Sequence, residues 1–170
     1  IDYITDTLNR LIKFYYENDS NGNPDKLIAI SIPGLGTNEE IQTVRFYYET
    51  VALNSAGKFT GQITAPSSIR VLRWVFMPST KTAFKYEYNS NYGMIKKIER
   101  RVGVTVSDPT STTAMGSVTN EGAWAASTEY NYPDGTTALS DVPKYSKRTD
   151  DWYGKTSSIP AETYYDVPEP

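Results

Sequence analysis

The apolar and polar positions along the chain form a pattern of strands separated by turns. Short runs rich in aromatic and β-branched residues alternate with clusters of Asn, Asp, Ser, Gly and Pro. Within one run Phe84, Tyr86 and Tyr88 fall on one face of a strand, and Lys85 and Glu87 fall on the other. The pattern predicts strands at residues 10–16, 26–32, 41–48, 58–63, 69–76, 82–88, 94–100 and 124–130, and a short strand pair within 147–156.

Turn signals separate these strands, and helix signals are few. Asn21-Gly22, Ser55–Gly57 and Asn89–Gly93 each stand between two runs that are neighbours in sequence, which predicts consecutive antiparallel hairpins. Residues 1–10 could form a helical turn, and Thr37–Glu40 resembles a capping box. Aromatic and β-branched residues follow both segments, so strand is favoured there too.

A tyrosine motif recurs along the chain. A Tyr followed by an acid or an amide, usually with a second aromatic residue just before it, occurs five times. Irregular spacing of this kind is typical of stacked repeats with loop insertions of different lengths. The five pairs, separated by 32, 40, 42 and 35 residues, are Tyr16-Glu17, Tyr48-Glu49, Tyr88-Asn89, Tyr130-Asn131 and Tyr165-Asp166.

Residues 107–122 interrupt this pattern of strands and turns. They are small and polar and predict a loop inserted between strands. We therefore interpret residues 1–170 as a single β-repeat segment with about four to five irregular repeats. The chain begins at Ile1, without Met or a signal peptide, so we expect a piece of a larger protein.

Composition favours thin layers over a deep core. Hydrophobic residues make up 38% of the chain, below the ~45–50% of ordinary globular domains, while Tyr alone contributes 14 residues. A tyrosine ring can pack against apolar atoms while its hydroxyl stays in contact with water. The sequence therefore predicts half-buried strands faced with tyrosine.

Charge and residue usage argue against several classes of function. The formal charge is -3, so no basic surplus is present to neutralise the phosphates of a nucleic acid. No apolar run approaches the ~18 residues of a membrane span. The chain has neither His nor Cys, which rules out His-dependent triads and disulfides. We expect a protein that is not an enzyme and that uses no cofactor and no metal.

The hairpins resemble the RHS or YD-repeat family, whose pattern is similar to D-x-x-G-R-x-x-x-Y-x-Y-D-x-x-G-x-L. Residues 6–17 fit its first part, with Asn9 in place of the usual Gly, and residues 21–28 fit its second part. Residues 92–95 and 152–156 look like further turn sections. The resemblance covers most of the chain outside residues 107–122.

The resemblance implies a sheet that spirals into a hollow shell, as in bacterial RHS proteins, insecticidal toxin complexes and teneurins. In bacteria the shell typically encloses a toxic C-terminal domain until delivery. A core segment of the family cleaves the chain at an Asp-Pro-containing motif. Asp108-Pro109 is followed by Thr-Ser-Thr in place of the Gly-containing pattern, so this activity is not carried over. The implied location is the cell surface or the secreted fraction, and the implied partners are neighbouring repeats, an enclosed toxin, or a second copy paired edge to edge.

Within each hairpin the repeated residues have structural roles. Tyrosine rings can stack on those of adjacent hairpins, and the acid or amide can accept backbone N–H groups at the turn. Glycine supplies the positive φ that a tight turn requires. The residues to which we assign these roles are the five Tyr pairs given above together with Gly22, Gly57 and Gly93.

Clusters of acidic, amide and basic residues could in principle form other kinds of site. The adjacent acids Glu39-Glu40 and Asp150-Asp151 could serve a hydrolase, but neighbours on a strand point to opposite faces. Residues 18–23 and 89–91 carry closely spaced acids and amides, as calcium-binding loops do. Both segments lack a distal acid that could bind the ion with two oxygens, so ordinary turns are favoured. The basic residues 96–97 and 100–101 are expected to be a solvated strand face.

An extracellular adhesin or glycan-binding fibre module is the alternative function, and a carboxylate-dependent hydrolase is the least favoured. The glycan interpretation requires exposed aromatic rings. The candidates for such a platform are Trp74, Trp124 and Trp152. A lone aromatic residue in a strand more often belongs to a core.

Overall fold

A computed structural model describes residues 2–36, 39–61, 64, 66–133, 137–138 and 143–165. These residues form strands and turns without a helix, which confirms the all-β prediction. The strands are β1 (Tyr3–Thr5), β2 (Leu11–Asn18), β3 (Pro24–Pro33), β4 (Glu40–Ala52), β5 (Phe59–Thr60), β6 (Ser68–Met77), β7 (Thr82–Tyr88), β8 (Ile95–Val102), β9 (Thr105–Val106), β10 (Val118–Asn120), β11 (Ala123–Asn131), β12 (Thr137–Ala138), β13 (Lys147–Trp152) and β14 (Ala161–Tyr164).

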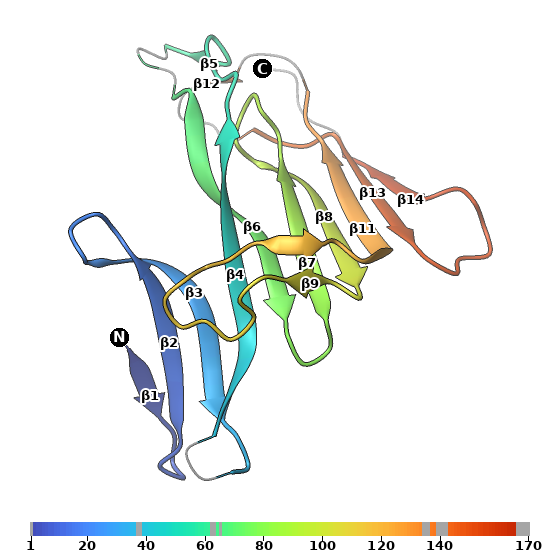
Figure 1. The fold of residues 1–170 in the computed structure, drawn as a ribbon. Coiled ribbons are helices and arrows are strands. Elements are labelled where there is room, and N and C mark those ends of the chain that lie inside the picture. The colour runs from blue at the N-terminus through green and yellow to red at the C-terminus, as the bar shows by residue number, and fades with distance from the viewer. Residues whose placement is uncertain are drawn as a thin grey trace. The chain divides into compact units, whose positions relative to one another are not determined.

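Ten strands form one sheet in the order β1-β2-β3-β4-β6-β7-β8-β11-β13-β14. This order follows the chain, as the colour sequence in Figure 1 makes visible. The runs β1–β2–β3–β4 and β11–β13–β14 are antiparallel. Each strand thus pairs with a strand close to it in sequence, as expected for consecutive hairpins.

The expected return strand at residues 58–63 takes a different course. Of the residues described there, only Phe59–Thr60 form a strand, which pairs in parallel with β12 in a separate two-stranded sheet. Gly57 and Gly61 flank it with φ values of 71° and 78°, left-handed conformations that no regular strand adopts. The neighbour of β4 in the large sheet is therefore β6, and residues 62 and 63 lie outside the described residues.

The chain divides into two compact units. The first comprises Ile1–Tyr47, Trp74–Phe84 and Arg101–Ala123, and the second comprises Tyr48–Arg73, Lys85–Arg100 and Trp124–Pro170. Both units draw residues from β4, β6, β7 and β8. The number of repeats in the chain stays a prediction.

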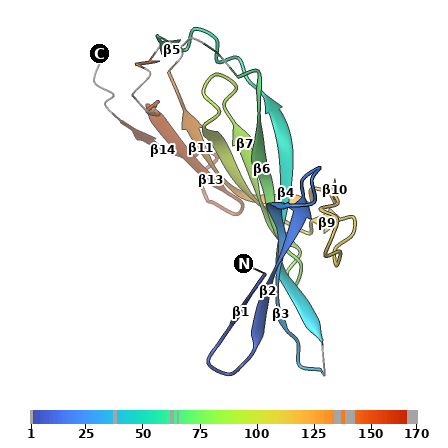
Figure 2. The same ribbon diagram turned by 90° about the vertical axis from the view of Figure 1, so that its left-hand side faces the viewer.

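The first unit has a compact core beneath a strap, which we define as residues 104–120. Its apolar side chains come from β4, β6 and β7 on one side and from the strap on the other. Figures 1 and 2 show β9 and β10 lying across one face of these strands. The predicted insertion at residues 107–122 thus contributes to a core. That core contains Tyr47, Trp74, Phe76, Ala83 and Val104, with Val106, Met115 and Val118 packed against it.

The second unit relies on half-buried side chains, as the tyrosine-rich composition predicts. Tyr88 is half-buried and its hydroxyl donates to the carbonyl of Leu72 at 2.6 Å. Glu99 is 5% exposed and accepts from Lys97 Nζ at 2.8 Å. This hydrogen bond raises the pKa of Lys97 above its ordinary value. In this unit, tyrosine hydroxyls and ion pairs therefore supply the hydrogen bonds that polar groups near the packed rings require.

Candidate functional site

Aspartate side chains close two of the N-terminal turns in the same way. Asp6 Oδ1 accepts the backbone N–H groups of Leu8 and Arg10, each at 2.9 Å. Asp19 Oδ1 accepts those of Asn21 and Asn23 at 2.8 and 2.9 Å. In each turn the carboxylate oxygen satisfies donors that the strand ladder leaves unpaired.

The fourth position of each of these turns is left-handed. Asn9 has a φ of 60° and Gly22 a φ of 83°. Asn9 therefore adopts the conformation that the glycine of the repeat pattern was expected to supply, which Asn tolerates better than most residues. Asp151 and Gly154, which has a φ of 79°, have the same spacing, but Asp151 Oδ1 accepts the N–H of Trp152 and its carboxylate pairs with Lys155.

Asn89 has the turn role that the tyrosine motif predicts. Its Oδ1 accepts the N–H groups of Asn91 and Tyr92 at 2.8 and 3.2 Å, and Gly93 follows with a φ of 69°. Glu17 does not act in this way, because it lies within β2 opposite Lys26 and the turn acid is Asp19. The spacing of Asp to a Gly or Asn three residues later could have identified Asp19 and Asp151 from sequence.

The other motif residues lie at different points of their strands. Tyr48 and Glu49 lie inside β4, which continues to Ala52, and the Glu49 carboxylate lies 3.3 Å from Arg73 Nε. Gly57 has a φ of 71° in a turn closed by the Lys58 N–H on the Ser55 carbonyl. Of the remaining motif residues, Tyr16 lies in β2, Tyr130 and Asn131 end β11, Tyr165 follows β14, and Asp166 lies outside the described residues.

Protonation of the turn acids should weaken the fold at low pH. Backbone hydrogen bonds from Asn23 and then Asn21 hold the pKa of Asp19 below its ordinary value of 3.8. A carboxyl with a depressed pKa in the folded state stabilises the fold above the unfolded-state pKa. That stabilisation is lost as the pH falls through the folded-state value.

We therefore expect Asp19→Asn to flatten the acid limb of the stability profile. Asn keeps the Oδ1 acceptor but does not titrate. Thermal unfolding followed from about pH 5 to about pH 2 should decline less steeply in this variant than in the unmodified chain. Asp19→Ala is the control, because it removes the acceptor and should lower the melting temperature at neutral pH as well. Parallel profiles for Asp19→Asn and the unmodified chain would contradict this role.

Tyrosines at the ends of three adjacent strands lie side by side in the second unit: Tyr130 in β11, Tyr145 just before β13 and Tyr165 just after β14. The rings of Tyr130 and Tyr145 have centroids 4.9 Å apart, and those of Tyr145 and Tyr165 are 5.0 Å apart at 84°. The register explains this, because Arg148 of β13 pairs with Tyr130 and Lys147 with Tyr164. The motif residues Tyr130 and Tyr165 thus each contact Tyr145, which is not a motif residue, and each such pair contributes about 0.5–1.5 kcal/mol beyond area burial.

The row of aromatic rings continues beyond these three. Tyr132 lies 6.3 Å from Tyr145 and 6.3 Å from Tyr92, and Tyr92 packs edge-on against Phe59 at 5.7 Å. The Tyr92 hydroxyl donates to the carbonyl of Pro133 at 3.1 Å, and the Tyr132 hydroxyl donates to that of Ile95 at 2.9 Å. We call residues 59, 92, 132, 145, 130 and 165 the tyrosine ladder.

Arg45 fastens the strap to the sheet in the first unit. Its guanidinium donates to the backbone carbonyls of Ser111, Ala114 and Met115 at 2.7, 2.9 and 3.1 Å. It also donates to Gln42 Oε1 at 2.6 Å and to the Tyr47 hydroxyl at 3.2 Å. The side chain is 0% exposed. A charged group this deeply buried is stable here because neutral acceptors surround it.

A second polar cluster lies on the same face of β2, β3 and β4. The Glu40 carboxylate accepts from Lys13 Nζ at 2.7 Å, from Ser31 Oγ at 2.5 Å and from the Tyr15 hydroxyl. Burial raises the pKa of Glu40, but these donors outweigh it and hold the pKa below 4.5. Burial, and then the hydrogen bond to Glu40, raise the pKa of Tyr15. The phenol therefore stays neutral and acts as a donor.

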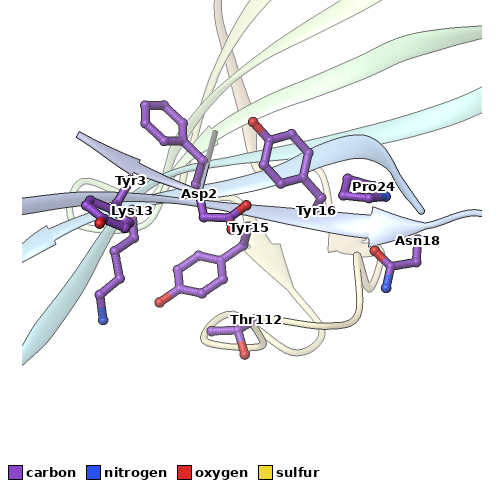
Figure 3. Close-up of a pocket in the computed structure, with 9 residues that line it drawn as sticks. Asp2, Tyr3, Lys13, Tyr15, Tyr16, Asn18, Pro24 and Thr112 are labelled. Carbon is purple, nitrogen blue, oxygen red and sulfur yellow. The ribbon is translucent and has the colours of Figure 1, made fainter. Parts of the chain in front are cut away.

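An open hollow of about 360 Å³ adjoins this cluster. Figure 3 shows the Tyr15 ring directed toward Thr112 of the strap, with Tyr16 directed to the opposite side. Tyr15, Lys13 and Thr112 line one part of it, and Asp2 and Tyr3 line another. Of the charged residues that line it, Lys13 is paired with Glu40.

The adjacent acids do not converge on a substrate. Glu39 accepts the N–H of Gly36 at 2.8 Å, whereas Glu40 faces Lys13. Asp150 accepts from Thr128 Oγ1 at 2.7 Å, whereas Asp151 pairs with Lys155. Members of each pair have different partners, as their alternation along a strand predicts.

The three tryptophans have different exposures. Trp74 is 6% exposed within the core, so it presents no surface to a glycan. Trp124 is half-buried in β11. Trp152 is 47% exposed and borders an open hollow of about 390 Å³ that residues 154–157 and 159–161 complete. Of the three expected platform residues, Trp152 therefore presents the most accessible ring.

The described residues include no group of three or more acidic, His or Cys side chains placed to hold a metal ion. No helix in this part of the chain has the length and hydropathy needed to cross a membrane.

Comparison with known proteins gives no match to a family model, to a curated protein or to a solved structure.

Proposed function

We propose that the chain is a structural scaffold, a segment of an RHS-type shell whose consecutive hairpins extend one sheet around or beside a secreted effector. Strand order carries the proposal: ten strands lie in the sheet in the order of the chain. A sheet built in this way grows by adding one hairpin after another. Two further features support the same interpretation: the like Asp turns between β1 and β2 and between β2 and β3, and the ring contacts beside β11, β13 and β14.

The outermost strands support continuation of the sheet. All residues of β1 and of β14 are exposed, and Tyr3 and Tyr164 are 59% and 72% exposed. Exposed edges of this kind are templates for pairing with a further strand. In a shell, neighbouring repeats of the same parent chain would cover them.

The gene encoding this chain supplies the test. We expect its product to contain further Tyr pairs and Asp-x-x-Gly turns, and a C-terminal effector domain. In the purified parent protein, limited proteolysis should spare that domain while the shell is folded and degrade it after the shell is unfolded. A gene product with neither further repeats nor an effector domain would refute the shell proposal.

A glycan-binding module is the second candidate, and exposed Trp152 favours it. An indole ring beside a hollow bordered by Thr156, Ser157 and Lys155 offers an apolar face and polar groups together, as sugar-sized ligands require. Lys155 is already paired with Asp151, so its position is fixed.

Glycan-array binding by the purified chain tests this second function. Trp152→Ala should reduce binding at least about tenfold, the size expected when a buried contact worth about 1.4 kcal/mol is lost. Tyr153→Ala is the matched control, because Tyr153 is 82% exposed but does not line the hollow. Equal losses in both variants, or no binding by the unmodified chain, would dismiss the glycan function and leave the scaffold.

A further inference from the structure

Two members of the tyrosine ladder lie in a geometry suited to covalent coupling. Tyr145 precedes β13 and Tyr165 follows β14, and their ring centroids are 5.0 Å apart. The Tyr165 N–H donates to the carbonyl of Ser146 at 2.9 Å, so the backbone fixes the two residues as cross-strand neighbours. The pair thus needs no rearrangement of strands to react.

The two phenols also interact through their oxygen ends. A hydrogen bond joins the side chains of Tyr145 and Tyr165 and raises the pKa of Tyr145. The carbon atoms ortho to a phenolic oxygen are adjacent to the ring carbon that bears it. A contact between the hydroxyl groups therefore brings ortho carbons of the two rings close together. The Tyr130–Tyr145 pair, at 4.9 Å and 58°, has no such hydrogen bond described.

The two tyrosines are not equally accessible to an oxidant. Tyr165 is 40% exposed, and Tyr145 is half-buried. The chain has no Cys, so a disulfide cannot fasten the exposed edge strand β14. A cross-link at this position would close a loop through β13 and β14 and restrict the unfolded chain in the same way.

We propose that Tyr145 and Tyr165 form an oxidative cross-linking site, at which a haem peroxidase using hydrogen peroxide joins the two rings as dityrosine. Each phenol gives up one electron and its hydroxyl proton and becomes a phenoxyl radical. The two electrons and two protons reduce one hydrogen peroxide to two waters. The radicals combine to form a bond between ortho carbons. The hydrogen on each of those carbons then moves to its oxygen, which restores both phenols.

Peroxidase treatment of the dilute, purified chain, followed by trypsin and mass spectrometry, tests the proposal. We expect a linked species containing peptides 145–147 and 156–170, lighter than their sum by two hydrogen atoms, with dityrosine fluorescence. Tyr145→Phe and Tyr165→Phe should each reduce it at least about tenfold, because proximity drives the coupling. Amide exchange in β14 should also slow after treatment of the unmodified chain.

Two controls separate proximity from simple exposure. Tyr164 and Tyr153 are 72% and 82% exposed, more than Tyr165, and the Tyr164 hydroxyl donates to Glu162 at 2.7 Å. Tyr164→Phe and Tyr153→Phe should both retain the linked species. Its persistence in Tyr165→Phe, coupling of Tyr145 to Tyr130, or products formed mainly between separate chains would overturn the assignment.

Discussion

Replacing Arg45 by Met should lower the free energy of unfolding by about 3–5 kcal/mol, because each acceptor left without a donor costs about 1–3 kcal/mol. Met restores much of the lost volume but donates no hydrogen bond. The carbonyls of Ser111, Ala114 and Met115, which belong to the strap and are partly buried, would lose their donor. Backbone carbonyls cannot be substituted along with the arginine, so the usual rescue of a buried ion pair by apolar residues does not apply.

Chemical denaturation of Arg45→Met measures the loss, and hydrogen exchange locates it. Exchange should rise first at residues 107–117, the part of the strap that Arg45 fastens. Arg70→Met is the matched control, because Arg70 is exposed and its nearest described partner is Thr50 Oγ1 at 3.4 Å. That variant should change the free energy of unfolding by less than about 0.5 kcal/mol. Equal effects of the two substitutions would mean that Arg45 does not fasten the strap.

Strand positions could be predicted from sequence because their signals are local. β7, expected at residues 82–88, has these bounds, and Lys85 Nζ lies 3.9 Å from the Glu87 carboxylate on one face, as alternation requires. β1, β9, β10, β12 and β14 were not predicted. Four residues or fewer carry too little alternation to distinguish a strand from a loop.

Partner choice and burial depend on residues distant in sequence, so they could not be predicted. Arg45 occupies a strand position where a charged residue normally faces water. It is buried because the carbonyls of residues 111–115 lie over it, some 66 to 70 positions along the chain. No local pattern indicates this contact. The small polar residues of that segment instead suggested a solvated insertion.

The tyrosine motif was only partly informative about packing and about turns. Ring contacts occur at Tyr130, Tyr145 and Tyr165, but Tyr145, which contacts both of the others, was not among the motif residues, so stacking of one motif tyrosine on another stays a prediction. The predicted turn role holds at Asn89 but belongs to Asp19 in the first hairpin. Strand length explains the difference, since β2 continues two residues beyond Tyr16.

Gly122→Ala should cost more than any other Gly→Ala exchange with a described environment in the first unit. A Cβ at this position would lie 2.2 Å from the Val102 carbonyl oxygen and 2.9 Å from the Val104 nitrogen. Both are backbone atoms and cannot turn aside as a flexible side chain would. The φ of 66° adds about 1–2 kcal/mol for a residue with a Cβ. We expect a total loss of about 4 kcal/mol or failure to fold.

Gly22→Ala separates the two contributions. Gly22 has a comparable φ of 83°, but nothing lies within 4 Å of its added Cβ. Its cost should therefore be the conformational penalty alone, about 1–2 kcal/mol. Denaturation of both variants measures the difference, which is the cost of the clash between residue 122 and residues 102–104. A Gly122→Ala variant as stable as Gly22→Ala would mean that the strap can move away from β8. Gly122 lies in the short connection between the end of β10 and the start of β11. If that connection can shift without cost, the strap is only loosely attached to the sheet.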